Sequence, residues 1–143
     1  TNLDTSGNPF TDQEPWHSGW LELMKYTDLI MLDIKQIDEQ EHIKLTGHSN
    51  KNILAMAREL SDMKKPVWIR HVLVPDGSDK DEYLHRLADF IHTLSNVERV
   101  EVLPYHTLGK FKWENLGLSY PLEGVNPPTQ ERIDSARKIL GAI

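Results

Sequence analysis

Polar and charged side chains follow or interrupt the short apolar runs of this sequence. They are Asp4 and Thr5, Asp33 and Lys35, Arg70 and His71, and Tyr105 and His106. A carboxylate can accept hydrogen bonds from ribose hydroxyls or bind a cation, and a nearby ammonium can hold a carboxylate or phosphate. A histidine can stack on a base, shuttle a proton or bind a metal. Together these residues indicate a candidate ligand site.

Asp33 and Lys35 form the sharpest pair. Alternate side chains of a strand point to the same side, so these two would share one face. Spacing alone leaves two interpretations open, a ligand site and an ion pair at a strand end, because buried charges need partners in either case. Arg70 lies inside an apolar stretch and requires a ligand or a carboxylate, with Asp33 or Glu101 as candidates. His71 would point to the opposite face and pack beneath a helix.

The remaining histidines carry weaker signals. His106 directly follows a strand candidate and is either a ligand-binding residue or a loop histidine without a role. No other pair has convincing metal-ligand spacing. The others are interpreted as surface or helix residues: His17, His42, His48, His85 and His92.

Apolar periodicity predicts helices that alternate with strands. Helical spacing of apolar residues occurs at 16–26, 53–60, 83–94 and 133–140. Short apolar or β-branched runs predict strands at 29–32, 67–74 and 97–103, after the end of another strand near Asp4. Asn50 and Thr129 are predicted N-caps. This order indicates an α/β fold with a parallel sheet, in which ligands bind at the carboxyl ends of the strands. The continuous run at 29–32 favours a strand buried on both faces.

Composition excludes several classes of protein. The formal net charge of −6 argues against a nucleic-acid binder. No apolar run approaches the roughly 18 residues of a membrane helix, so no membrane partner is expected and the cytoplasm is the predicted location. The chain has no cysteine, which rules out disulfides, thiolate nucleophiles and cysteine metal ligands from these residues. Its 143 residues are about one domain.

Four segments are distinctive as a set: 3–7 (LDTSG), 31–36 (MLDIKQ), 68–75 (WIRHVLVP) and 103–110 (LPYHTLGK). In this order and at this spacing they resemble the pyruvate formate-lyase-activating enzymes, which are radical S-adenosylmethionine proteins. The similarity continues through Lys112-Trp113 and Pro127-Pro128 and covers nearly the whole chain. Each motif alone is only suggestive, whereas the combination is specific.

The resemblance implies that residues 1–143 are the C-terminal part of a single partial (β/α)6, TIM-like barrel domain with parallel strands. In that family a [4Fe–4S] cluster binds S-adenosylmethionine, whose reductive cleavage gives a 5′-deoxyadenosyl radical. The radical abstracts hydrogen from a glycine of pyruvate formate-lyase, and a flavodoxin-type protein is the expected reductant. The chain alone is expected to be inactive, because the cluster supplies the electron.

The resemblance also implies two sets of ligand residues and assigns no catalytic residue. The residues expected to contact or face S-adenosylmethionine are Asp33, Lys35, Arg70 and His106. Those resembling a monovalent-cation site beside the cofactor carboxylate are Asp4, Thr5, Asp33 and Met31, the last through its carbonyl. The family's cluster-binding cysteines and its Gly-Gly-Glu strand are absent and would precede residue 1. The glycine at position 77 also sits one place later than in the family pattern.

Two other functions remain open from the sequence. A metal-dependent hydrolase could use Asp33, His71 and His106, although Arg70 and His71 would face opposite ways. A non-catalytic module could dock on a glycyl radical enzyme without carrying a cluster. Retained metal with hydrolytic activity would favour the first, and cluster-independent binding would favour the second.

Overall fold

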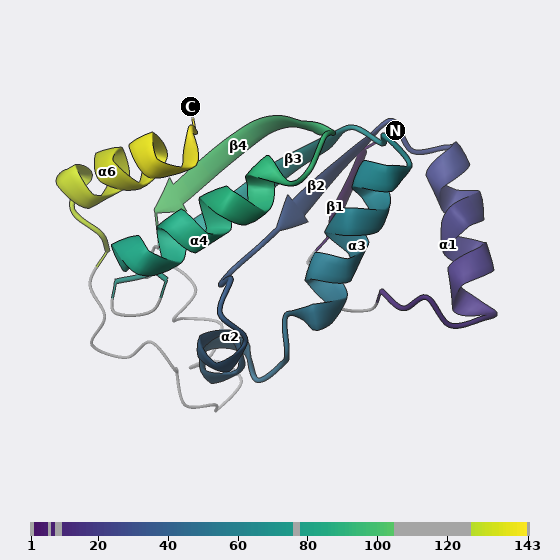
Figure 1. The fold of residues 1–143 in the computed structure, drawn as a ribbon, viewed down its shortest axis with the longest axis horizontal. Coiled ribbons are helices and arrows are strands. Elements are labelled where there is room, and N and C mark those ends of the chain that lie inside the picture. The colour runs from purple at the N-terminus through teal and green to yellow at the C-terminus, as the bar shows by residue number, and fades with distance from the viewer. Residues whose placement is uncertain (1, 6, 8–9, 76–77, 105–126, 143) are drawn as a thin grey trace, which may run out of the picture.

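The computed structural model describes residues 2–5, 7, 10–75, 78–104 and 127–142. Strands alternate with helices along the chain, as predicted (Figure 1). In chain order the elements are β1 (Asn2–Thr5), α1 (Trp16–Lys25), β2 (Leu29–Asp33), α2 (Glu39–Thr46), α3 (Lys51–Asp62), β3 (Val67–Leu73), α4 (Asp81–His92), β4 (Val97–Pro104) and α6 (Gln130–Leu140).

The four strands form one parallel sheet in the order β1-β2-β3-β4. Successive strands are neighbours because each helical crossover returns the chain to the same end of the sheet. This confirms the predicted α/β class and parallel pairing. The described strands make an open sheet, so closure into a (β/α)6 barrel stays a prediction for a longer protein.

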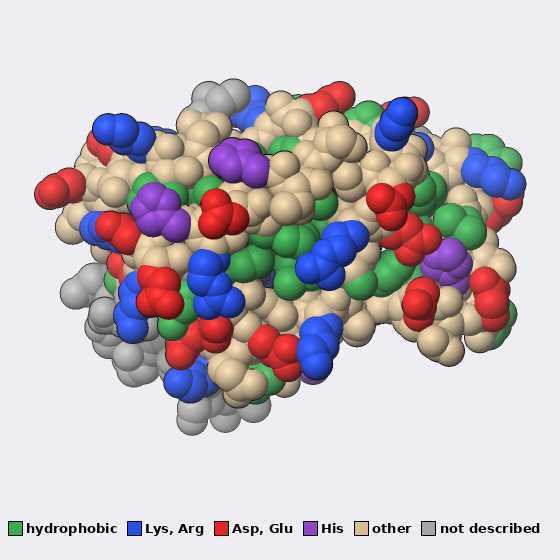
Figure 2. Space-filling model, in the orientation of Figure 1, with side chains coloured by type: hydrophobic (Ala, Val, Ile, Leu, Met, Phe, Trp, Pro, Cys, Tyr) green, Lys and Arg blue, Asp and Glu red, His purple; other side chains and the backbone are tan. Residues whose placement is uncertain are grey.

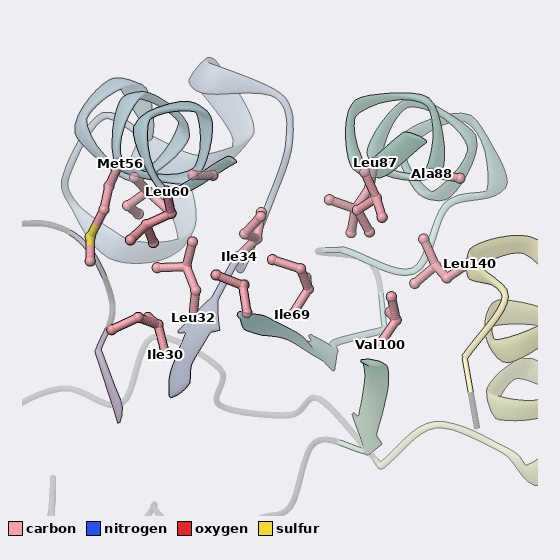
Figure 3. Close-up of a cluster of buried hydrophobic side chains, with 14 of the residues drawn as sticks. Ile30, Leu32, Ile34, Met56, Leu60, Ile69, Leu87, Ala88, Val100 and Leu140 are labelled. Carbon is pink, nitrogen blue, oxygen red and sulfur yellow. The ribbon is translucent and has the colours of Figure 1, made fainter. Parts of the chain in front are cut away.

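One face of the sheet carries the hydrophobic core. Ile30, Leu32, Ile69 and Val100 alternate along the strands with more exposed residues and point toward the helices. Helices α3 and α4 lie across this face, and α6 packs beside β4 (Figures 1 and 3). Each such side chain contributes about 1.5–3 kcal/mol when fully buried. The helix residues of this cluster include Met56, Leu60, Leu87, Ala88 and Leu140.

The opposite face of the sheet is more open. Met31 in β2 and Trp68 in β3 are only half-buried, as are the charged residues that follow each of them by two positions. The prediction that the run at 29–32 is buried on both faces is therefore wrong for the described structure. In this strand Leu29 and Met31 lie on the second face and are partly exposed. A continuous apolar sequence alone does not distinguish such a strand from one that is covered on both faces.

The short helix α2 is absent from the sequence-based prediction. It begins at the N-cap Asp38, whose carboxylate accepts from the Glu41 amide at 3.0 Å, and ends at Gly47 with a φ of 82°. His42 is the only buried residue within α2, so the helix has no apolar periodicity from which it could be predicted. Capping chemistry rather than a hydrophobic stripe defines this element.

Two predicted caps have different outcomes. Thr129 caps α6, because its hydroxyl accepts from the Arg132 amide at 3.3 Å. Asn50 occupies the N-cap position of α3 but makes no side-chain cap. Its buried amide instead donates to the carbonyls of Gln36 at 3.0 Å and Ile37 at 2.8 Å. Asn50 therefore anchors the segment that follows β2, which carries candidate site residues.

Helix α1 lies beside α3, next to the β1 edge of the sheet (Figure 1). Trp20 packs edge-on against Phe10, with ring centroids 5.0 Å apart. His17 donates from Nε2 to Oε1 of Glu59 at 2.5 Å and so joins α1 to α3. Figure 2 shows this end of the molecule with acidic side chains around a histidine. Among the described residues, no helix combines the length and apolar content needed to span a bilayer.

Candidate functional site at the strand ends

The segment after β2 places two predicted site residues on one side. Ile34 is buried and donates its backbone N–H to the Arg70 carbonyl at 3.0 Å, which extends the pairing with β3. Asp33 and Lys35 flank it and remain half-buried. Because alternate residues of extended chain point the same way, both lie on the open side of the sheet. This is the arrangement that the spacing predicted.

Asp33 and Arg70 are paired across neighbouring strands. Their Cα atoms are register partners, and Arg70 Nε lies 3.9 Å from Asp33 Oδ1. The next register partner along this row is Glu101 in β4. The row therefore runs carboxylate, guanidinium, carboxylate across three strands of the open face. The ion pair with Asp33 that the sequence left open is present, and both charges lie on the more exposed face of the sheet.

One row below lies a pair that sequence reasoning missed. Arg99 places its guanidinium carbon 5.2 Å from the centre of the Trp68 ring, and its Nε lies 3.0 Å from Glu101 Oε1. Trp68 and Arg99 are register partners. The two-residue period of a strand could have indicated Trp68, because it stands two positions before Arg70 and must share its face. Arg99 thus provides a countercharge for Glu101.

The proposed cation site is only partly visible. The Cα atoms of Asp4 and Met31 are register partners in β1 and β2, and Thr5 pairs with Leu32. Thr5 Oγ1 accepts from the Gly7 amide at 3.0 Å and shapes the turn after β1. The structure brings β1 and β2 together at these residues, and cation binding there stays a prediction.

Other predicted positions fall outside the described structure. His106 lies outside the described residues, as do Tyr105, Lys110, Lys112 and Trp113. The contact with the cofactor that is expected for His106 therefore stays a prediction.

His71 is separated from the candidate site by the sheet. It is buried, as predicted, and its Nδ1 donates to the Ile34 carbonyl at 2.7 Å. Burial lowers the pKa of His71, so the ring is neutral near pH 7. A hydrolase that joined Asp33 to His71 is disfavoured, because the two side chains lie on opposite faces.

The burial of His42 was not predicted from the sequence. This residue was interpreted as a surface or helix residue, but it is buried and donates from Nδ1 to the His48 carbonyl at 2.5 Å. Its Nε2 is buried without a hydrogen-bond partner in the described structure. Burial lowers the pKa of His42, and the charge of Lys35 lowers it further.

An iron–sulfur cluster does not fit the residues of this chain. It has no cysteine, and within the described ranges no group of three or more His, Asp or Glu side chains could hold a metal ion. The ligand chemistry present is carboxylate, ammonium and guanidinium, which suits a polar organic molecule.

Solved structures share this fold. A domain of pyruvate-formate lyase-activating enzyme from Bacteroides vulgatus matches with a TM-score of 0.75 at 20% identity, covering 98% of this chain and 74% of that chain. A radical SAM methyltransferase from Sphaerobacter thermophilus matches with a TM-score of 0.62 at 17% identity, covering 98% of this chain and 37% of that chain. At these identities the likeness concerns the fold alone.

Sequence relatives are much closer. A pyruvate formate-lyase-activating enzyme from Streptococcus mutans is 54% identical over 98% of this chain. Enzymes of the same name from Staphylococcus epidermidis and Staphylococcus aureus are 55% and 53% identical over 95% of it. The chain spans about half the length of these relatives, 53–54%. No protein-family model matches it. Over nearly its entire length, the chain is therefore homologous to about half of each of these pyruvate formate-lyase-activating enzymes.

Proposed function

We propose that the longer protein containing this chain activates pyruvate formate-lyase by using S-adenosylmethionine to form a glycyl radical. The observation that carries the proposal is 54% identity to a named activating enzyme over 98% of the chain. Because the chain spans about half of that relative, the activity, the cofactor and the partner belong to the longer protein. A [4Fe–4S] cluster held outside these residues would supply the electron for cofactor cleavage.

The chain's contribution is to bind and orient the cofactor. The Asp33 carboxylate would accept from the ribose hydroxyls, and Lys35 would hold the methionyl carboxylate. Arg70 would hold the Asp33 carboxylate turned toward the open face, and His106 would lie near the adenosyl group. The ion pair between Arg70 and Asp33 supports this division of roles, because it fixes one cofactor contact before the cofactor arrives.

The proposal includes a monovalent-cation site beside the cofactor carboxylate. Its oxygen donors would be the carboxylates of Asp4 and Asp33, the Thr5 hydroxyl and the Met31 carbonyl. The pairing of β1 with β2 at Asp4 and Met31 supports it. A cation there would offset the negative charge that two carboxylates and the methionyl group bring together. The partners proposed for the longer protein are pyruvate formate-lyase and a flavodoxin-type reductant, both in the cytoplasm.

The test compares this chain with a version extended upstream. Both are incubated anaerobically with iron and sulfide, and then with S-adenosylmethionine, reductant and pyruvate formate-lyase. The cluster absorbance and the glycyl radical signal in electron paramagnetic resonance should appear only with the extended protein. Asp33→Asn in that protein should reduce the radical yield, whereas Asp89→Asn on the exposed surface of α4 should not.

Two outcomes would contradict the proposal. An extended protein that assembles a cluster but yields no radical on pyruvate formate-lyase would rule out activation of that enzyme. Tight binding of the 143-residue chain to pyruvate formate-lyase, with no cluster in either protein, would instead indicate a docking module.

A further inference from the structure

Two successive peptide units carry the chain from Asp33 to Lys35, and strand β3 holds both of them. The first unit donates its N–H, that of Ile34, to the Arg70 carbonyl at 3.0 Å. The second unit accepts at its oxygen, the Ile34 carbonyl, a hydrogen bond from Nδ1 of His71 at 2.7 Å. Successive residues of β3 therefore fix successive peptide units of this segment, Arg70 through its backbone and His71 through its side chain.

The bond from His71 holds the chain just beyond the end of a strand. Strand β2 ends at Asp33, and Ile34 is the next residue along the chain. Its carbonyl needs a donor after the strand has ended, because buried backbone groups are almost always paired. The His71 ring is itself buried in the packed interior, so it presents its N–H from a fixed position. The imidazole thus extends the hold of β3 on the segment that carries Lys35.

The position of the Ile34 oxygen governs the direction of the Lys35 side chain. The peptide bond is planar, so the Ile34 carbonyl and the nitrogen and Cα of Lys35 lie in one plane. A rotation of this plane would move the oxygen away from the imidazole and would also redirect the Cα–Cβ bond of Lys35. The hydrogen bond from His71 opposes that rotation. It does so from the core side of the sheet, while Lys35 lies on the open side.

A second anchor follows Lys35 directly. Asn50 donates through Nδ2 to the Gln36 carbonyl at 3.0 Å and to the Ile37 carbonyl at 2.8 Å. Lys35 therefore stands between two anchored carbonyls, those of Ile34 and Gln36, while its own side chain is half-buried. Holding a binding group in place before the ligand arrives reduces the ordering cost of binding.

We propose that His71 is a positioning residue of the ligand site, because its hydrogen bond to the Ile34 carbonyl directs the Lys35 ammonium to the open face of the sheet. His71 touches no ligand and acts through the peptide unit between Ile34 and Lys35. The ligand group concerned is the one assigned to Lys35, the carboxylate of an amino-acid moiety. The inference therefore rests on the proposed binding of S-adenosylmethionine, and it adds a residue from the opposite face of the sheet.

The test compares two ligands of the longer protein, reconstituted with its cluster. They are S-adenosylmethionine and 5′-methylthioadenosine, which lacks the methionyl carboxylate, and their affinities are measured by calorimetry. His71→Leu removes the donor and should weaken the binding of S-adenosylmethionine about tenfold. The affinity for 5′-methylthioadenosine should stay at the wild-type value. A general loss of structure would instead weaken the binding of both ligands.

Two amide variants separate the position of the donor from its presence. His71→Asn carries its amide nitrogen near the place of Nδ1 and should bind S-adenosylmethionine like the wild type. His71→Gln carries it near the place of Nε2 and should bind as weakly as His71→Leu. This pair decides the question even if His71→Leu does not fold. Ile69→Val, at a buried position of the same strand, is the packing control and should leave the ratio of the two affinities unchanged.

Lys35→Met separates a failure of this inference from a failure of the proposed function. It should selectively lose affinity for S-adenosylmethionine, and adding His71→Leu should cause no further loss, because both residues act through one contact. If Lys35→Met keeps the affinity, the cofactor contact proposed for Lys35 is wrong and the inference falls with it. If only Lys35→Met is selective, or if His71→Asn and His71→Gln bind alike, the positioning role of His71 alone is overturned.

Discussion

Arg70 Nε lies 3.9 Å from Asp33 Oδ1, across two strands whose Cα atoms are register partners at these positions. Their side chains are 26% and 28% exposed. An ion pair at a partly solvated site contributes about 0–1 kcal/mol to stability. The pair therefore adds little to folding while holding two opposite charges on the open face of the sheet. Its main effect should be on ligand binding.

Arg70→Gln tests this separation of roles. The free energy of unfolding in urea should fall by about 1 kcal/mol or less. The affinity of the reconstituted longer protein for S-adenosylmethionine, measured by calorimetry, should fall about tenfold or more, because Asp33 loses its orienting charge. Arg58→Gln, on α3 at the other side of the sheet, is the control and should leave the affinity unchanged. If Arg70→Gln left the affinity unchanged, the ion pair would have a structural role only and no role in cofactor binding.

Asn50 should matter more for stability than its place at a helix start implies. Asn50→Ala removes the donor to the buried Gln36 carbonyl and to the part-buried Ile37 carbonyl, and it should lower the free energy of unfolding by about 2–4 kcal/mol. Asn50→Asp keeps the shape but removes the amide donor, and it should destabilise at least as much. Lys51→Ala, at the exposed neighbouring position, should change stability by about 0.5 kcal/mol or less. A loss no larger than this in Asn50→Ala would show that the bridge is dispensable.

His17 should contribute stability that disappears at alkaline pH. The hydrogen bond to Glu59 raises the pKa of His17 above its ordinary value of 6.5, with smaller contributions from the charges of Glu59, Glu14 and Asp12. In such a case the folded state holds the proton more tightly than the unfolded state. The stabilisation is complete below about pH 6.5 and is lost as the pH rises through the raised pKa.

Proton resonances of the His17 ring, followed by NMR, should titrate above pH 6.5. Glu59→Gln should bring the pKa back toward 6.5, and His17→Gln should remove this part of the pH dependence of unfolding. A His17 pKa at or below 6.5 in the wild type would refute the coupling.

His71 should contribute stability with the opposite pH dependence to that of His17. Burial lowers its pKa, so the folded state keeps the ring neutral while the unfolded state takes up a proton near pH 6.5. Stability from this residue is therefore present above pH 6.5 and is lost as the pH falls below it. In His71→Gln the free energy of unfolding should decrease less steeply below pH 6.5 than in the wild type. Ile69→Val costs stability without changing a titratable group and should retain the wild-type slope. Equal slopes for His71→Gln and the wild type would contradict this assignment.

The sequence by itself determined the class of fold and the relative facing of two pairs of side chains. Alternating apolar runs and helical stripes require βα units, because each element must bury one side against the next. Two-residue spacing required Asp33 and Lys35 to share a side, and adjacency required Arg70 and His71 to face opposite ways. These local rules depend only on backbone geometry, which is why they could be applied without a structure.

Only the tertiary structure decided which residues meet. The register between β2 and β3 pairs Asp33 with Arg70, and that between β3 and β4 pairs Trp68 with Arg99. Register depends on packing between segments far apart in the chain, and a shift of one residue would exchange the two faces. Asn50 was predicted as a cap and His42 as a surface or helix residue; His42 does lie in a helix, but the packing of α2 and of the segment after β2 buries both side chains. The local sequence could not show this, because the burial of a residue depends on segments that pack against it only in the folded chain.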